Sequence, residues 1–396
     1  MSLTNTPNAN RLHIGIYGKR NSGKSSLINA LTHQQTALVS DVAGTTTDPV
    51  YKAMEVHPIG PCTFIDTAGF DDEGELGLLR VERTEEAVKK TDVALLVIAD
   101  GELRKEEQWV KKLKEAGVPV IAVVNKADEL LDAENILRAV KKQLGLDAVL
   151  VSAKTGEGVA RIKEELVRAI PAEYEMQSIA GRLVSPGDVV LLVMPQDIQA
   201  PKSRLILPQV QTIRDLLDNK CLVMSVTTDK LDAALASLTM PPKLIITDSQ
   251  VFKTVMEKKP KESLLTSFSV LFAAYKGDIG AFVEGAGAID RLNEHSRVLI
   301  AEACTHAPLT EDIGRVKLPR ILRQRFGEGL SVDMVSGVDF PSDLSQYDLI
   351  IHCGACMFNR KYVMTRIKTA REQGIPITNY GVAIAKLTGI LDKVVY

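Results

Sequence analysis

The fold of the N-terminal part of this chain is decided by residues 13–31, which read HIGIYGKRNSGKSSLINAL. The short apolar run HIGIY leads directly into the loop GKRNSGKS, and the helix-like stretch SLINAL follows. This is the GxxxxGK[ST] pattern in the strand–loop–helix setting that phosphate-binding loops require. The backbone N–H groups of such a loop and the N-terminus of its helix favour bound phosphate. We therefore predict a nucleotide site at this turn.

Each position of the loop has an expected role. Gly18 and Gly23 allow the backbone to close around phosphate oxygens, and we expect Ser26 to contribute to nucleotide binding. Lys24 should reach the β- and γ-phosphates, and the Ser25 hydroxyl should ligate Mg²⁺. The loop alone would be moderately specific, because glycine-rich loops are common.

Two further segments complete a magnesium and γ-phosphate site. In Asp66-Thr-Ala-Gly69 the carboxylate can hold the magnesium shell, and the Gly69 N–H can sense the γ-phosphate. In the intervening loop, GTTTD at 44–48, we predict that Thr46 supplies the second magnesium hydroxyl. Together with Lys24 and Ser25, these residues are the expected catalytic set.

Base recognition is predicted for two later strand ends, NKAD at 125–128 and SAK at 152–154. The Asp128 carboxylate can accept two hydrogen bonds from the guanine N1–H and N2–H₂ edge, which adenine does not offer, so discrimination should be large. Such sheets bind ligands at the carboxyl ends of their strands. The residues that we expect to contact the base are Asn125, Lys126, Asp128, Ser152, Ala153 and Lys154.

With these five elements in order, the N-terminal region resembles the translation-factor-related GTPases of the Era and TrmE type. Phe70 follows DTAG where Ras-like enzymes place a water-positioning Gln, so intrinsic hydrolysis should be slow or rely on another group. Asn21 matches the asparagine that ligates K⁺ in TrmE-like enzymes, where the ion acts like an arginine finger. The resemblance implies K⁺-stimulated GTP hydrolysis. The alternative is that Asn21 only caps its own turn.

The whole chain reads as α/β, with strand-like runs alternating with helical stretches throughout. A length of 396 residues exceeds what one core usually supports. We predict three domains: a doubly wound phosphate-loop domain at 11–172, a small α/β domain at 180–270 and a third α/β domain at 271–396. The middle block shows no chemistry in its sequence, so an assembly surface and a plain spacer both remain open.

Composition limits the partners and the cellular location that we expect for this chain. The net charge of −2 argues against a broad basic surface, so no nucleic-acid partner is expected. No apolar run reaches the ~20 residues that span a bilayer, and the N-terminus lacks an apolar signal core, so we expect a cytoplasmic protein without membrane contact. Five cysteines, three of them in two motifs, do not form a disulfide framework. Cys62 and Cys221 lie in apolar runs and are predicted to be buried thiols.

Near the C-terminus stand two ligand clusters, Cys304-Thr-His306 and His352-Cys353-Gly-Ala-Cys356. If the strands that end at Cys304 and Cys353 are neighbours in a parallel sheet, the three sulfurs converge. Thiolates and imidazole suit both Zn²⁺ and iron–sulfur clusters. Spacing alone leaves these two open, with a redox-active CxxC as a third reading. His306 and His352 could each be ligands, and His352 could equally be a core imidazole.

The combination of CxH, a gap, HCxxC and an Era-like domain resembles the FeFe-hydrogenase maturation GTPase (HydF) family. The resemblance implies a 4Fe–4S cluster on Cys304, Cys353 and Cys356, with His306, His352 or another group at the fourth position. It also implies a homodimer formed through the middle domain, and a scaffold that receives a transient two-iron precursor from two radical-SAM maturases and delivers it to apo FeFe-hydrogenase. The segments that carry the resemblance are GTTTDPVYK, GPCTFIDTAGFDDEGELG, APKSRLILPQV, PKLIITDSQV, CTHAPLTEDIGRVKLPR, IIHCGACMFNR and GIPITNYGV.

One departure and two alternatives accompany this reading. The phosphate loop carries Lys19 and Arg20 before Asn21, where many relatives have a small residue and Pro, which puts nucleotide affinity and K⁺ coordination in question. An RNA-modification or ribosome-assembly GTPase with a structural zinc domain is the second hypothesis, and the missing basic patch counts against it. A redox-sensing GTPase without cargo is the third, and it predicts a hydrolysis rate that follows the oxidation state of the cluster.

Overall fold

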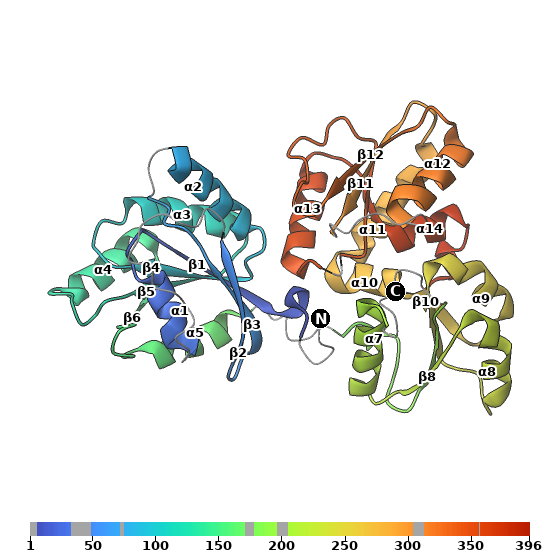
Figure 1. The fold of residues 1–396 in the computed structure, drawn as a ribbon, viewed down its shortest axis with the longest axis horizontal. Coiled ribbons are helices and arrows are strands. Elements are labelled where there is room, and N and C mark those ends of the chain that lie inside the picture. Colours follow the sequence, from blue (N-terminus) through green and yellow to red (C-terminus); the bar gives the residue numbers. More distant parts are fainter. Residues whose placement is uncertain are drawn as a thin grey trace. The chain divides into compact units, whose positions relative to one another are not determined.

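The computed structural model divides the chain into two compact units, Met1–Met176 and Gln177–Tyr396. Figure 1 shows each unit as strands with helices packed over them. The two units are described separately below. The structure describes residues 6–32, 49–71, 75–170, 178–195, 205–303, 313–355 and 357–396.

The first unit is built on a six-stranded sheet in the order β2-β3-β1-β4-β5-β6. Every neighbouring pair is parallel except β2 and β3, which run antiparallel. Strand β2 is therefore an antiparallel edge strand on an otherwise parallel sheet. The strands are β1 (Leu12–Gly18), β2 (Val50–Val56), β3 (Gly60–Asp66), β4 (Val93–Ile98), β5 (Val120–Val124) and β6 (Ala148–Leu150).

Helices cover both faces of this sheet. The side chains of α1 and α5 share one hydrophobic core with alternate residues of β1, and those of α3 and α4 share a second core on the opposite face. The predicted doubly wound α/β fold is therefore confirmed for this unit. The helices are α1 (Lys24–Thr32), α2 (Glu75–Val88), α3 (Arg104–Glu115), α4 (Ala133–Leu144) and α5 (Val159–Ala169), with a short turn η1 (Asn8–Asn10) before β1.

Local sequence explains where these helices begin and end, and α4 is an example. The Asp132 side chain accepts a hydrogen bond from the Asn135 N–H, which satisfies one of the unpaired donors of the first turn. Gly145 adopts a left-handed conformation (φ 66°) at the other end, which terminates the helix. Val140 and Leu144, spaced by one turn, point into the core.

The second unit contains two four-stranded parallel sheets. The first has the order β10-β9-β7-β8, so that β8 is an edge strand. Its strands are β7 (Val189–Val193), β8 (Leu222–Val226), β9 (Leu244–Thr247) and β10 (Leu264–Ser267). Its helices are α7 (Leu207–Asp218), α8 (Leu231–Ser237), α9 (Phe252–Lys258) and α10 (Phe268–Lys276), with short turns η2 (Thr228–Lys230) and η3 (Ser249–Val251).

The second sheet of this unit has the order β12-β11-β13-β14, which makes β11 and β13 direct neighbours. Its strands are β11 (Arg297–Glu302), β12 (Ser331–Ser336), β13 (Leu349–His352) and β14 (Ile377–Asn379). Its helices are α11 (Ile279–Ala286), α12 (Leu318–Phe326), α13 (Arg360–Glu372) and α14 (Tyr380–Leu387). Short turns η4 (Gly287–Arg291), η5 (Ile313–Lys317) and η6 (Leu391–Lys393) complete it.

A single hydrophobic core joins the two sheets of the second unit. Leu191 of β7 and Ile245 of β9 belong to the same buried cluster as Ile300 of β11, Ile350 of β13 and Val382 of α14. The three sheets agree with the predicted α/β class, but the last two pack as one body. The boundaries at residues 180 and 271 therefore stay predictions.

Two further expectations concern burial and the membrane. Cys62 lies in β3 with no exposed surface, and Cys221, just before β8, is also buried. Burial raises the pKa of the Cys62 thiol to about 12, so this thiol stays protonated and inert. None of the helices in the described part of the chain has the length and apolar character that a bilayer crossing requires.

Candidate functional site

The phosphate loop lies between β1 and α1, as the sequence pattern requires. The Lys24 ammonium donates to the carbonyl oxygens of Gly18 (3.0 Å) and Lys19 (2.8 Å), which ties its side chain across the loop. Gly23 has a φ of 90°, and a Cβ there would collide with the Asn125 side chain. Glycine at this position is therefore a steric requirement, because the loop packs against the segment expected to bind the base.

The proposed magnesium ligands of the first unit meet at the end of β3. The Ser25 hydroxyl donates to Asp66 Oδ2 at 2.7 Å. The next residue, Thr67, is buried and its hydroxyl donates to the Ile16 carbonyl at 2.6 Å, which fixes the strand end. One hydroxyl and one carboxylate side by side suit Mg²⁺, which prefers oxygen ligands. Thr46, the expected second hydroxyl, lies outside the described residues.

Gly69 lies against the phosphate loop. A Cβ on Gly69 would come within 2.7 Å of the Arg20 backbone nitrogen. The same Arg20 N–H donates to Asp71 Oδ1 at 2.6 Å, so a carboxylate from the segment after β3 is bound to the loop. The close approach leaves room only for glycine at position 69, and the γ-phosphate contact of Gly69 stays a prediction.

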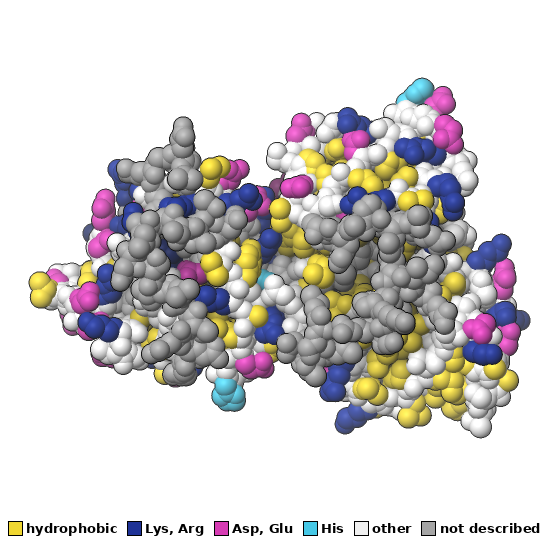
Figure 2. Space-filling view, in the orientation of Figure 1, with side chains coloured by type: hydrophobic (Ala, Val, Ile, Leu, Met, Phe, Trp, Pro, Cys, Tyr) yellow, Lys and Arg dark blue, Asp and Glu magenta, His cyan; other side chains and the backbone are white. Residues whose placement is uncertain are grey.

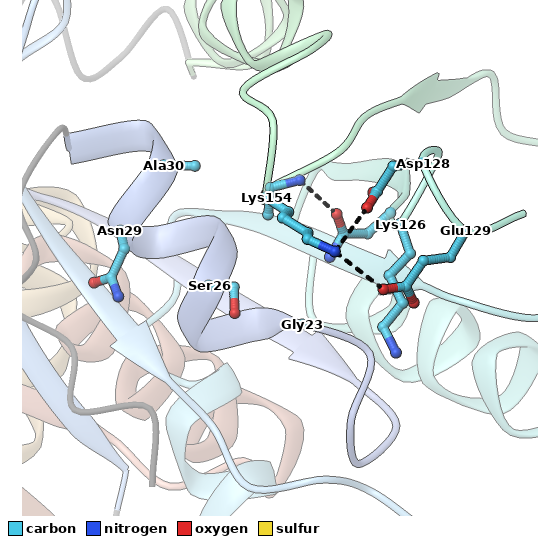
Figure 3. A pocket seen from close by; sticks show the side chains of 10 residues that line it. Gly23, Ser26, Asn29, Ala30, Lys126, Asp128, Glu129 and Lys154 are labelled. Carbon is cyan, nitrogen blue, oxygen red and sulfur yellow. Dashed lines mark hydrogen bonds and ion pairs between the residues drawn. The ribbon is translucent and has the colours of Figure 1, made fainter. Parts of the chain in front are cut away.

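A cavity of about 390 Å³ lies beside α1, and Figure 3 shows the residues around it. Its volume is in the range of small-ligand sites. Asn125 is one of its lining residues: its Nδ2 donates to the Ser22 carbonyl at 2.9 Å, and its Oδ1 accepts from the Ala153 N–H at 3.0 Å. One side chain therefore ties three loops together. The lining residues are Gly23, Ser26, Asn29, Ala30, Asn125, Lys126, Asp128, Glu129, Ala153 and Lys154.

The Asp128 carboxylate is held by two neighbouring side chains. Its Oδ1 accepts from the Ser152 hydroxyl at 2.5 Å, and its Oδ2 lies 3.7 Å from the Lys154 ammonium (Figure 3). The Ser152 hydrogen bond lowers the pKa of Asp128, so the carboxylate is ionised and only accepts hydrogen bonds. A purine edge with two adjacent N–H donors matches it.

Phe70 and Lys19 are both held away from the phosphate site. Phe70 is buried and stacks on Trp109, with ring centroids 5.5 Å apart. Its phenyl ring therefore belongs to the hydrophobic core and cannot position water. The Lys19 ammonium lies 2.9 Å from Asp100 Oδ1 and 3.5 Å from Glu106 Oε1. Burial lowers the pKa of Lys19, but these carboxylates raise it by more than burial lowers it. The net effect is a raised pKa, so Lys19 stays charged.

In the second unit, the ends of β11 and β13 meet around Cys353. The Ala301 carbonyl accepts from the Cys353 N–H at 2.9 Å. The Cys353 sulfur in turn accepts from the backbone N–H groups of Ala303 (3.0 Å) and Ala355 (3.4 Å). Backbone N–H groups that point at sulfur stabilise a charged, metal-binding thiolate. Ala303 directly precedes Cys304, and Ala355 directly precedes Cys356. Each residue that donates to the Cys353 sulfur is therefore followed in the sequence by a predicted ligand.

The other two predicted cysteine ligands and His306 fall outside the described residues. Cys304 and His306 lie in the segment 304–312, which the structure does not describe, and the same holds for Cys356 alone between residues 355 and 357. Within the residues that the structure does describe, no group of three or more His, Cys, Asp or Glu side chains is gathered around a common point. The N–H donors around the Cys353 sulfur fit a thiolate bound to zinc or to an iron–sulfur cluster. The number of cysteine sulfurs that bind the metal stays a prediction.

His352 is buried at the end of β13, and both of its ring nitrogens are engaged. Nε2 lies 3.0 Å from Arg366 Nη1, and Nδ1 lies 2.9 Å from the Cys353 carbonyl. Burial and the Arg366 charge lower the pKa of His352 to about 3, so the ring is neutral. This arrangement favours the core-imidazole alternative over the ligand role.

Sequence reasoning missed two residues of this site. Arg366 lies on α13, and Asn379 ends β14, where its side chain donates to the Cys353 carbonyl at 3.1 Å. Both are far from Cys353 along the chain. The motif spacing therefore contains no signal for them, although an arginine on the apolar side of a helical stretch could have been noticed.

Three family models match the chain. Residues 13–126 match the 50S ribosome-binding GTPase model. Residues 179–277 match the Hydrogen maturase F dimerization domain, and residues 280–396 match the Hydrogen maturase F tetramerization domain. The two maturase models together span more than half of the chain.

Individual relatives match part of the chain. The tRNA modification GTPase MnmE of Paraburkholderia xenovorans is 40% identical over 159 residues, which covers 40% of this chain and 34% of that protein. GTPase Der of Wolinella succinogenes is 37% identical over 171 residues, covering 40% and 35%. The chain thus spans about a third of the length of these curated relatives. A crystal structure of Era from Aquifex aeolicus bound to GDP and AlF₄⁻ has 20% identity and a TM-score of 0.36, covering 64% of this chain and 99% of that one.

Proposed function

Because the chain belongs to the hydrogen maturase F family and its first unit carries a GTPase domain, we propose that it is a GTP-hydrolysing scaffold of FeFe-hydrogenase maturation. In this proposal it holds a 4Fe–4S cluster, receives a two-iron precursor from two radical-SAM maturases and delivers it to apo FeFe-hydrogenase. The observation that carries the proposal is the Cys353 sulfur, which accepts two backbone N–H groups where β11 and β13 end. We place the protein in the cytoplasm, where thiols stay reduced.

The cluster ligands of the proposal are Cys304, Cys353 and Cys356, with His306 or an exchangeable group at the fourth position. Such a cluster would supply an iron whose coordination is not completed by cysteine. The chain itself contributes the N–H donors from Ala303 and Ala355, which offset negative charge at the sulfur. Zn²⁺ remains chemically compatible with the same thiolates, and metal analysis separates the two.

The first unit of the proposed scaffold acts as a switch. Lys24, Ser25 and Asp66, with Thr46, would stabilise charge on the transferring phosphoryl group together with Mg²⁺, and Asp128 would select guanine. Any effect on cargo transfer requires that the GTP and GDP forms differ in partner affinity. Equal affinity of both forms for the maturases and the hydrogenase would remove the switch from the account.

The transfer role is tested by reconstituting maturation in vitro. The chain is loaded anaerobically with iron and sulfide, incubated with both maturases and their substrates, repurified and mixed with apo FeFe-hydrogenase. Hydrogen evolution should appear with the sample that was incubated with the maturases and be absent with a sample that was not. Full activation by the unexposed protein would contradict the carrier role.

Potassium should stimulate GTP hydrolysis by this chain. Asn21 has a φ of 58° and is exposed at the phosphate loop, where its side chain can ligate a cation between the phosphates. A fixed cation there offsets transition-state charge, and one charge-stabilising contact of this kind is worth roughly 100- to 1,000-fold in rate. Steady-state phosphate release is measured in KCl and in NaCl at equal ionic strength, with Asn21→Ala as the matched variant. Equal rates in both salts would exclude the potassium site.

The dimer surface of the proposal is the edge strand β8. Among the described strands, β8 pairs only with β7, so its outer edge is open to a second copy. Leu222 on β8 is 61% exposed, and Leu217 at the end of α7 is 52% exposed. Figure 2 shows hydrophobic side chains gathered over this end of the unit, in the region that Figure 1 labels β8. An exposed apolar edge of this kind suits isologous strand pairing.

Leu222→Lys should therefore weaken the dimer without unfolding the chain. In a two-fold interface the substitution acts twice, and each buried leucine contributes about 1.5–3 kcal/mol, so the loss should exceed roughly 100-fold in dissociation constant. Light scattering during size-exclusion chromatography measures the shift toward monomer. Leu131→Lys is the control, because Leu131 is fully exposed in the first unit. An unchanged dimer in Leu222→Lys would exclude the β8 edge.

A further inference from the structure

Cys353 is restrained at every polar atom. Its N–H donates to the Ala301 carbonyl, and its sulfur accepts the two N–H groups described above. Its carbonyl oxygen accepts from Asn379 Nδ2 at 3.1 Å and faces His352 Nδ1 at 2.9 Å. Asn379 is itself fixed, since its Oδ1 accepts from the Gly381 N–H at the start of α14. The direction in which the sulfur points is thus set by residues from several strands and helices.

The hydrogen on the His352 ring can be assigned from its neighbours. A guanidinium only donates hydrogen bonds, so Nε2 of His352 accepts from Arg366 Nη1. In a neutral imidazole the other nitrogen then carries the proton, and Nδ1–H donates to the Cys353 carbonyl. Neither nitrogen presents a lone pair to a metal in this state.

The Arg366 side chain lies inside the core and not on its surface. The residue is 2% exposed. Its guanidinium carbon lies 4.7 Å from the ring centroids of Phe340 and Phe358 and 4.9 Å from that of Tyr362. Nη2 donates to the Gly337 carbonyl at 2.5 Å. Three aromatic faces and a carbonyl therefore hold the planar group so that Nη1 meets His352.

We propose that Arg366 is a positioning residue that keeps His352 from binding the metal and holds the turn at Cys353 in place. The coordination position that no cysteine fills is then occupied by a group other than the His352 ring. For His352 to ligate through Nε2, the buried guanidinium would have to give up its acceptor. For it to ligate through Nδ1, that nitrogen would have to give up its proton and its bond to the Cys353 carbonyl. The first change takes the acceptor away from a buried guanidinium N–H, which is costly. The second removes one of the two hydrogen bonds that the Cys353 carbonyl accepts. This inference rests on the proposed cluster site, but its first part concerns the protein alone.

The first experiment needs no metal. Long-range ¹H–¹⁵N spectra of the full, metal-free chain with ¹⁵N-labelled histidine report which ring nitrogen is protonated, and six histidines keep the spectrum simple. We expect His352 as the Nδ1–H form, identified by its loss in His352→Gln. An Nε2–H form in the wild-type chain would overturn the proposal. A failure of cluster loading would leave this result intact and would count only against the proposed function.

The second experiment uses the chain after anaerobic reconstitution, reduced and examined by pulsed EPR for nitrogen coupled to the cluster. In His352→Gln the Gln oxygen can still accept from Arg366, and iron content and EPR spectrum should match wild type. Arg366→Met should gain a nitrogen coupling that Arg366→Met/His352→Gln lacks, whereas Arg366→Lys should resemble wild type. The proposal would be overturned if the wild-type cluster showed a nitrogen coupling that His352→Gln removes. It would also be overturned if Arg366→Met folded and bound iron but showed no new nitrogen coupling. If Arg366→Met does not fold, the comparison of wild type with His352→Gln decides.

Discussion

Cys353→Ala should reduce cluster-bound iron to background and hydrogenase activation by at least roughly 100-fold, because loss of even supporting contacts around metal ligands costs 10- to 100-fold. The substitution removes the sulfur that accepts the Ala303 and Ala355 N–H groups at the ends of β11 and β13. Serine in its place should fail as well, since a hydroxyl is a poor ligand for iron–sulfur clusters. Iron and sulfide per chain, visible absorption and hydrogen evolution are the measurements.

Cys221→Ala is the matched control for this prediction. Cys221 is a buried thiol in the same unit, next to β8 and outside the predicted ligand motifs. Its iron content and activation should equal those of wild type. If Cys353→Ala kept full iron and activated the hydrogenase as wild type does, Cys353 would not be a cluster ligand and the scaffold proposal would fail.

Asp128→Asn should invert the choice of nucleotide. The Asp128 carboxylate is ionised and held by the Ser152 hydroxyl, and in the proposed site it would accept from two purine N–H groups. An amide at the same place presents one donor and one acceptor, so it repels one guanine N–H and suits the oxygen that xanthine carries at that edge. Affinity for GTP should fall at least roughly 100-fold, while XTP becomes the better ligand. Competition of both nucleotides against a fluorescent GTP analogue measures this directly.

Glu129→Gln serves as the control for base selection. Glu129 also lines the cavity, but its carboxylate is more than half exposed and lies 4.0 Å from Lys154. An exposed pair of this length contributes little, so nucleotide preference should stay with GTP. Asp128→Asn that still bound GTP as wild type does would show that another group selects the base.

The first unit was predictable because its signals are local. Gly23 and Lys24 act within one loop, and the loop conformation follows from a few adjacent residues. The strand ends carrying Asp66, Asn125 and Ser152 were recognisable as apolar runs that stop at polar residues. Parallel strands then bring those ends to one edge, without any further information being needed.

Elements that depend on distant packing were not predicted. The strand β2 has exposed residues at most positions, and it exists because it pairs with β3. The helix α14 is short and apolar, and it is stabilised by packing into the core that joins both sheets of the second unit. Segments of this kind carry weak periodicity, since tertiary contacts decide their conformation.

The metal site shows the same division. The spacing of the C-terminal motif pointed to Cys353, and the neighbouring strands β11 and β13 were foreseen as the condition for convergence. The engagement of His352 by Arg366 was not foreseen, because it joins a strand end to a helix fourteen residues later through side-chain packing. Distinguishing a ligand from a core imidazole requires knowing both ring partners, which only the fold supplies.

The central claim is that one polypeptide combines a guanine-nucleotide site with a thiolate-held iron–sulfur cluster. Mössbauer spectroscopy of the full chain, isolated and loaded anaerobically with ⁵⁷Fe, tests it most directly when combined with zinc analysis of the same sample. The account predicts the quadrupole doublets of a 4Fe–4S cluster, with nearly all the iron in that form, and little zinc. A stoichiometric zinc content with iron only in adventitious ferric form would contradict it.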